Sequence, residues 1–116
     1  TIDTEAPCLL LYPMTESQGL EQKIQALPSF NKATRRIQRL LIGHATEVEV
    51  DNSGRVLIPP LLREYANLTK EIVLVGQGNK FEIWDKEFWQ KHRDDWLAEE
   101  ADSTMDVPPA LQSIAL

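Results

Sequence analysis

The pattern of apolar and polar residues predicts that short strands and amphipathic helices alternate along the chain. Leu9 to Tyr12 form an apolar run of strand length, and Pro13 ends it. Apolar residues then recur at helical spacing as far as Pro28. Thr15 and Gln18 resemble a capping box at the start of this helix. The front of the chain is therefore predicted to be a strand followed by a helix.

A second amphipathic helix is predicted from about Asn31 to Ile42, with Gly43 as its stop. One of its faces is basic, because each helical residue turns by about 100°. The bases on this face are Lys32, Arg35, Arg36 and Arg39. Most basic stripes are ordinary solvated helix faces, but such a stripe can also contact nucleic-acid phosphates or line an interface between protomers. All three interpretations stay open.

The apolar period changes to two after this helix. Val48 and Val50 alternate with acidic residues, so one strand face is apolar and the other acidic. The run Asp51-Asn52-Ser53-Gly54 is a strong turn signal, since Asp suits the first position of a type I turn and Gly the last. Residues 55–58 resume a strand. We therefore predict a β-hairpin over residues 48–58, called the hairpin segment below.

The remaining chain is predicted to form a short helix, two strands and a long helix. Pro60 can occupy the first turn of the short helix, Leu61 to Ala66, and Asn67 suits a left-handed cap. The later elements are predicted at Glu71–Val75, Lys80–Trp84 and Lys86–Ala98. Trp89 and Trp96 share one side of the last helix, which is typical of packing or interface anchors.

A faint repeat relates the two ends of the chain. The shift that places Leu9 on Phe81 also places Leu11 on Ile83 and Ile24 on Trp96. In both copies a strand ends in an aromatic residue and leads into a helix. The repeat implies that a counterpart of the hairpin segment precedes Thr1.

Composition excludes several classes of protein. With 116 residues and 42% apolar residues the chain can form one compact core, and no apolar run approaches the length of a membrane span. A single cysteine allows no internal disulfide, which fits a reducing compartment. The net charge of −6 is concentrated from Phe81 onward, where nine acids face three bases, whereas six bases outnumber three acids between Asn31 and Arg63. This asymmetry fits a basic working face and an acidic end, or an ordinary solvated surface.

No constellation nominates catalytic chemistry. His44 and His92 lie far apart, no metal-ligand spacing is present, and Cys8 in an apolar strand is expected to be a buried, inert thiol. Nucleophile-elbow, P-loop and dinucleotide motifs are missing as well. We therefore predict a binding protein and not an enzyme, with no cofactor, metal or small-molecule substrate.

A family resemblance narrows this prediction. The stretch Ala45–Arg63 resembles the module of AbrB-type swapped-hairpin proteins, with its order of strand, turn, Gly-Arg, strand, proline and helix. The whole chain up to about Trp96 resembles the MraZ family of transcriptional regulators. That resemblance rests on four runs: Cys8–Pro13, Arg35–Ala45, the D-x-x-x-R motif Asp51–Arg55, and Leu68–Trp84.

The resemblance implies an α+β fold, in which an AbrB-type swapped-hairpin β-barrel carries flanking helices. It implies a truncated first module at residues 1–44, a complete second module at 45–98, and an acidic, flexible tail at 99–116. It further implies homo-oligomeric rings that bind double-stranded promoter DNA, at repeats upstream of the division and cell wall operon, in the cytoplasm at the nucleoid. A first D-x-x-x-R motif is expected roughly twenty to thirty residues ahead of Thr1.

The expected DNA-binding residues are Arg55, Asp51, Arg35, Arg36, Arg39 and Lys32. Arg55 has two interpretations: it pairs with Asp51 to shape the turn, or it is offered to guanine edges in a major groove. A different class of function stays open too, namely an oligomeric protein-interaction scaffold or antitoxin-like module that does not read DNA. The tryptophans from Trp84 to Trp96 are expected near the contact of an oligomer larger than a dimer.

Overall fold

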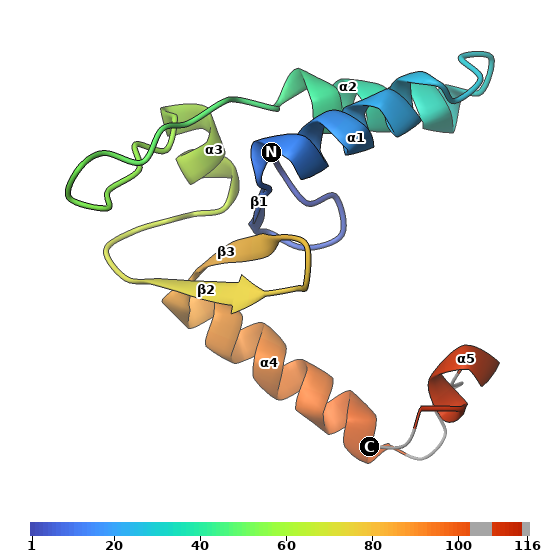
Figure 1. The fold of residues 1–116 in the computed structure, drawn as a ribbon. Helices are drawn as coiled ribbons and strands as arrows, with labels where there is room; N and C mark the ends of the chain where they lie inside the picture. The colour runs from blue at the N-terminus through green and yellow to red at the C-terminus, as the bar shows by residue number, and fades with distance from the viewer. Residues whose placement is uncertain (103–107, 115–116) are drawn as a thin grey trace.

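The computed structural model describes residues 1–102 and 108–114, which form a mixed α+β arrangement around a small antiparallel sheet (Figure 1). The elements follow in the order β1 (Leu9–Leu11), α1 (Met14–Gln25), α2 (Lys32–Gly43), α3 (Pro60–Tyr65), β2 (Ile72–Gly76), β3 (Phe81–Asp85), α4 (Lys86–Ala101) and α5 (Pro109–Gln112). Helices α1 and α2 lie together on one side of the sheet, and α4 leaves the sheet on the other (Figure 1).

The sheet has the order β1-β3-β2. Strands β2 and β3 form a hairpin whose turn contains Gly78 at φ +82°, a conformation that favours glycine. The first residues of the chain extend the sheet on the far edge of β1, through a bridge between Ile2 and Leu9. There the amide of Leu10 donates to the carbonyl of Thr1 at 2.7 Å.

The pairing of β1 with β3 reflects the sequence repeat. Leu9 lies opposite Ile83, and Leu11 lies opposite Phe81. Since the repeat equates Leu9 with Phe81 and Leu11 with Ile83, each strand pairs with its own counterpart in reverse order. An approximate twofold axis therefore relates the two strands. This agreement between register and repeat supports two related strand–helix units in one chain.

The core lies between one face of the sheet and α3. Ile2, Leu9 and Ile83 are buried there against Leu62 of α3 and against Ala66, the residue that follows α3. The partly buried side chains packed on this cluster are Leu11, Leu40, Ile58 and Leu68. The cluster thus includes residues from the front, middle and back of the chain.

The helices lie where the sequence pattern predicts them, but some of their ends differ from the prediction. Asn31 caps α2, because its side chain accepts a hydrogen bond from the amide of Ala33 at 2.7 Å. The predicted capping box of Thr15 and Gln18 is wrong: α1 begins at Met14, directly after Pro13, and its cap has no side-chain hydrogen bond. Because the fixed φ of proline already suits a helix start, Thr15 falls inside the first turn.

Two other helix ends differ. Gly43 does not stop α2, which runs through it to a cap at His44. Helix α4 continues to Ala101, into the segment expected to be a flexible tail, and α5 follows at Pro109–Gln112. The rest of that tail, residues 103–107 and 115–116, lies outside the described residues. Asn67 does adopt the predicted left-handed conformation, with φ 51°. Across the described residues, no helix has the length and apolarity that crossing a membrane requires.

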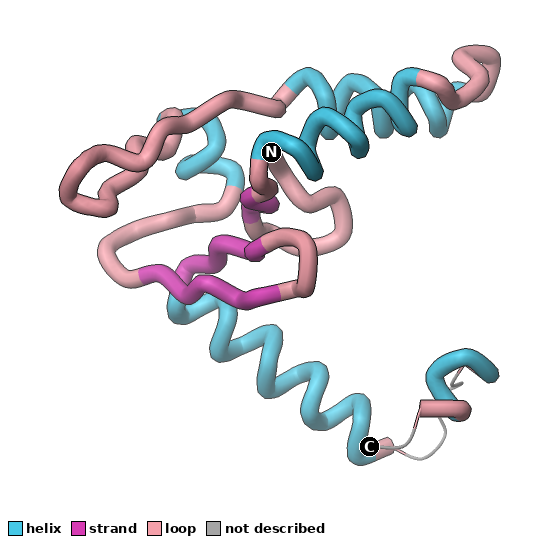
Figure 2. The backbone as a smooth tube through the Cα atoms, in the orientation of Figure 1, coloured by secondary structure: helices cyan, strands magenta, loops and turns pink. Residues whose placement is uncertain are grey.

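The hairpin segment departs most from prediction. Its turn forms, with Gly54 at φ +76° and its amide donating to the carbonyl of Asp51 at 3.0 Å. The predicted strands do not: one bridge, Val50 to Val56, joins the two arms of a long loop between α2 and α3 (Figure 2). An isolated two-stranded hairpin is marginal in water, and no described residue pairs with the outer edges of this one.

Candidate nucleic-acid interface

The turn at Asp51 is held by the carboxylate of that residue. One oxygen, Oδ1, accepts hydrogen bonds from the amides of Ser53 and Arg55 at 2.9 and 2.8 Å. The other, Oδ2, accepts from Nε of Arg55 at 3.1 Å. The spacing of the D-x-x-x-R motif therefore follows from a turn that brings its first and last residues side by side.

The same contacts set the electrostatics of the turn. The amide of Arg55, followed by the amide of Ser53 and the Arg55 side chain, holds the pKa of Asp51 below its usual range, against a smaller opposing effect of desolvation. Both charges are exposed, so their ion pair adds little stability by itself. Its structural effect is to fix the direction of the arginine.

The fixed arginine keeps hydrogen-bonding capacity. Arg55 uses Nε for the contact with Asp51, and its two terminal nitrogens make no hydrogen bond with any other described residue. The side chain is 79% exposed on a protruding loop. A guanidinium held at one edge and open at the other can donate two parallel bonds to a planar acceptor pair. The structural interpretation of Arg55 and the base-reading one are therefore compatible.

The basic stripe of α2 is exposed in full. Its members are Lys32, Arg35, Arg36 and Arg39. Arg35 donates from Nε to the carbonyl of Ser29 at 2.7 Å, which ties the stripe to the connection between α1 and α2. About one turn further along α2, Gln38 donates to the carbonyl of Ile24 at 3.1 Å and joins the two helices.

The structure does not bring the six predicted DNA-binding residues together. The loop that carries Asp51 and Arg55 lies at one end of the molecule, and the α1–α2 connection lies at the other (Figure 1). The six therefore form two separate groups.

A large apolar groove lies between the sheet and the hairpin segment, with a volume of about 1110 Å³. Its lining includes Val50 and Val56 from the hairpin segment and Leu74, Phe81 and Ile83 from the sheet. Leu74 is 57% exposed although it stands in the middle of β2. The apolar period of each strand indicated these residues, but their common groove depends on tertiary placement.

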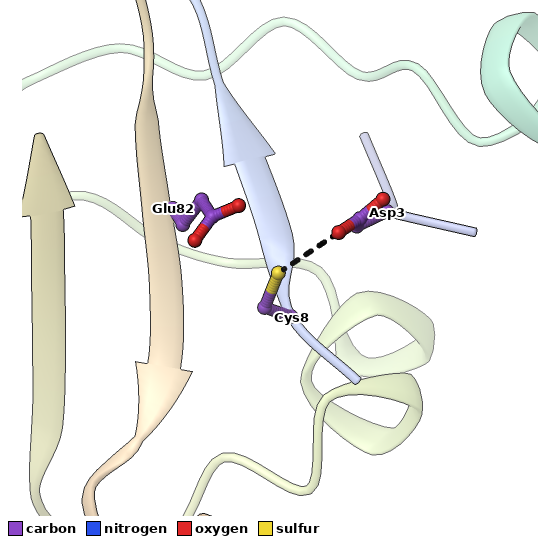
Figure 3. Close-up of side chains that lie close together, drawn as sticks. All are labelled: Asp3, Cys8 and Glu82. Atoms are coloured by element: carbon purple, nitrogen blue, oxygen red, sulfur yellow. Dashed lines mark hydrogen bonds between the residues drawn. The ribbon is translucent and has the colours of Figure 1, made fainter. Parts of the chain in front are cut away.

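Cys8 lies in a small polar group that the sequence did not indicate (Figure 3). Its thiol is fully buried and donates to Oδ2 of Asp3 at 3.6 Å, while a carboxylate oxygen of Glu82 completes a set within 4.8 Å. Burial, then the charges of Glu82 and Asp3, raise the pKa of the Cys8 thiol far above its usual range. Thiol and carboxylates are possible metal ligands, but a protonated thiol bonded to Asp3 accounts for the arrangement without an ion.

The tryptophans form a cluster on the other face of the sheet. Trp84 is buried, and its ring lies edge-on to the rings of Trp89 and Trp96 at 5.6 and 5.7 Å. His92 lies beside it at 5.1 Å. These contacts show that the tryptophans pack together, and they anchor α4 to β3 as far along the helix as Trp96.

Comparison with known proteins identifies the family. The family model described as "MraZ protein, putative antitoxin-like" matches residues 41–107, more than half of the chain. The chain belongs to the MraZ family. The MraZ match includes the hairpin segment, the β2–β3 hairpin and α4, and it confirms the resemblance seen in the sequence.

Curated MraZ proteins are similar over the whole of this chain. A protein named Transcriptional regulator MraZ from Legionella pneumophila (strain Corby) is 59% identical over 116 residues, which cover all of this chain and 76% of the relative. The proteins of the same name from Coxiella burnetii (strain RSA 493) and Halorhodospira halophila are 60% and 51% identical, with the same coverage.

Proposed function

We propose that this MraZ chain is a transcriptional regulator that binds double-stranded promoter DNA through the Asp51–Arg55 turn. The observation that carries the proposal is the state of Arg55, which is fixed through Nε and exposed at its two terminal nitrogens. A guanidinium so oriented matches the O6 and N7 acceptors of guanine in the major groove. The printed names of the relatives support the regulatory role.

The negative net charge of a single chain makes it a weak binder of DNA. The net charge is −6, so attraction to DNA has to come from local positive surface. Repeating the turn around a homo-oligomeric ring multiplies weak contacts by effective concentration. The proposal therefore includes a ring that engages several DNA repeats at once, upstream of the division and cell wall operon as the family resemblance implies.

The apolar groove supports the swapped-hairpin barrel. One face of the sheet leaves Leu74 half exposed, and the hairpin segment has unpaired edges. The sequence repeat predicts a counterpart of that segment ahead of Thr1, and the β1–β3 register is consistent with the repeat. A second hairpin of that kind, laid into the groove, would pair the free edges and cover the apolar face. In this proposal the two modules share one barrel and one core.

The test is a titration of full-length protein on operator and scrambled duplexes at two salt concentrations. Arg55→Ala should lose discrimination between the two duplexes by about 1–3 kcal/mol per contact. Arg63→Ala, which removes another exposed arginine outside the turn, is the matched control and should keep the discrimination. If Arg55→Ala leaves the ratio unchanged in a folded oligomer, this turn does not read bases, and the scaffold or antitoxin-like function becomes the better account.

A further inference from the structure

One end of the molecule is a basic tip, formed by the α1–α2 connection and the exposed stripe of α2. Residues 22–46 contain five bases and no acid. No base in this stretch forms an ion pair with any part of the chain that the structure describes. At the turn itself Phe30 is 95% exposed, so a large aromatic side chain stands in water beside the cations. A single exposed apolar residue is common on a monomer, so Phe30 counts here through its place beside the cations of the tip.

The outer half of α4 has the opposite character. Residues 94–101 contain four acids, Asp94, Asp95, Glu99 and Glu100, and no base. Every residue from 93 to 101 is exposed as α4 runs away from the sheet (Figure 1), although one edge of Trp96 still contacts Trp84. Trp96 and Leu97 are 41% and 53% exposed in the middle of these acids. Asp94 pairs with Arg93 at 3.5 Å and Trp96 contacts Trp84, but this acidic end of α4 remains exposed and has its own apolar side chains.

We propose that the basic tip of one protomer docks on the acidic end of α4 of a second copy. The two surfaces carry opposite charges, and each has exposed aromatic or aliphatic side chains that a contact would remove from water. An apolar centre with charged residues around it is the usual anatomy of a protein interface. The charges set partner and orientation, while Phe30, Trp96 and Leu97 supply the buried area.

This contact explains how a closed assembly could arise. The tip and the acidic end lie at different ends of one chain (Figure 1), so one contact leaves a free tip and a free acidic end on the pair. Head-to-tail contacts of this kind propagate until the rotation closes a ring. The inference names the surfaces of the oligomer in the proposed function, but it does not depend on base reading by Arg55.

The same cations could instead contact DNA phosphates, and the experiment separates the two. Full-length Lys32→Glu/Arg36→Glu reverses the tip, and full-length Glu99→Lys/Glu100→Lys reverses the acidic end. Light scattering on each variant alone should show a mass at least twofold below that of the wild type. Mixing the two variants should restore the large assembly, since each reversed surface then meets a complementary one on the other protein.

The matched control is Arg63→Glu/Lys70→Glu, which changes the charge equally at exposed bases outside the tip and should keep the wild-type mass. Circular dichroism checks that all variants are folded. Either reversed variant at full size, or a mixture that stays small, overturns the docking. A full-size tip variant that binds operator and scrambled DNA equally weakly assigns the stripe to phosphates instead. Failure of base reading is separate, because it appears only as an unchanged operator-to-scrambled ratio in Arg55→Ala.

Discussion

Leu74 offers a quantitative test of whether the apolar groove is filled. The side chain lines the groove and is 57% exposed, so somewhat less than half of it is shielded from water. Full burial of a leucine side chain is worth about 1.5–3 kcal/mol, and therefore Leu74→Ala should cost about 1 kcal/mol of unfolding free energy if the groove stays open. If a second hairpin covers the groove, Leu74 becomes a core residue and the cost rises to about 2–5 kcal/mol.

The assay is urea unfolding of the full-length protein, compared between wild type and Leu74→Ala. Leu9→Ala marks the cost of a residue that is buried without any further cover, and it should fall at about 2–5 kcal/mol. Leu57→Ala marks an exposed leucine of the hairpin segment that does not line the groove, and should change stability by less than about 0.5 kcal/mol. The barrel predicts that Leu74 behaves like Leu9. A cost near 1 kcal/mol or less for Leu74→Ala would refute the covering hairpin.

Three further predictions follow from single contacts. Because the pKa of Cys8 is raised in the folded state, mass spectrometry at pH 8 should show that the thiol alkylates far more slowly in folded than in denatured protein. Equal alkylation rates would contradict this. The stability that the protonated thiol contributes should be lost as pH rises above about 8.5. The lowered pKa of Asp51 predicts an NMR titration midpoint below about 3.9, and the contacts of the turn should weaken as pH falls through that midpoint; a midpoint at or above 3.9 would count against the hydrogen bonds that Asp51 accepts in the turn, above all the one from the amide of Arg55. Asn31→Ala should destabilise the protein by about 0.5–2 kcal/mol in thermal unfolding because α2 loses its cap, whereas Thr15→Ala, which removes no cap, should cost less than about 0.5 kcal/mol.

The sequence predicted the elements that depend on local patterns. The β2–β3 hairpin and α2 lie within about a residue of prediction, because periodicity and turn chemistry act over a few neighbours. The capping box at Thr15 failed because Pro13, two positions earlier, occupies the cap position of α1. The repeat between the two ends was visible in sequence, yet only the register of Leu10 against Glu82 shows that the repeated strands pair with each other.

Features that depend on distant parts of the chain escaped prediction. The strands of the hairpin segment were expected from alternation alone, but a strand needs a pairing partner as well as a pattern, and one bridge is what the described residues provide. The group around Cys8 unites Asp3 with Glu82, so no spacing along the chain announces it. For the candidate site, the motif located Asp51 and Arg55 and their contact, whereas the separation of this turn from the basic stripe required the fold.

The central claim is that Arg55 contacts guanine in the operator. The most direct measurement replaces operator guanines with 7-deazaguanine, which lacks the N7 acceptor, and titrates the modified and unmodified duplexes with full-length wild type and Arg55→Ala. At a contacted position the wild type should lose about 1–3 kcal/mol of binding free energy on modification, and Arg55→Ala should lose nothing further. Equal losses for the two proteins at every guanine would contradict the claim, because the modification would then act independently of Arg55.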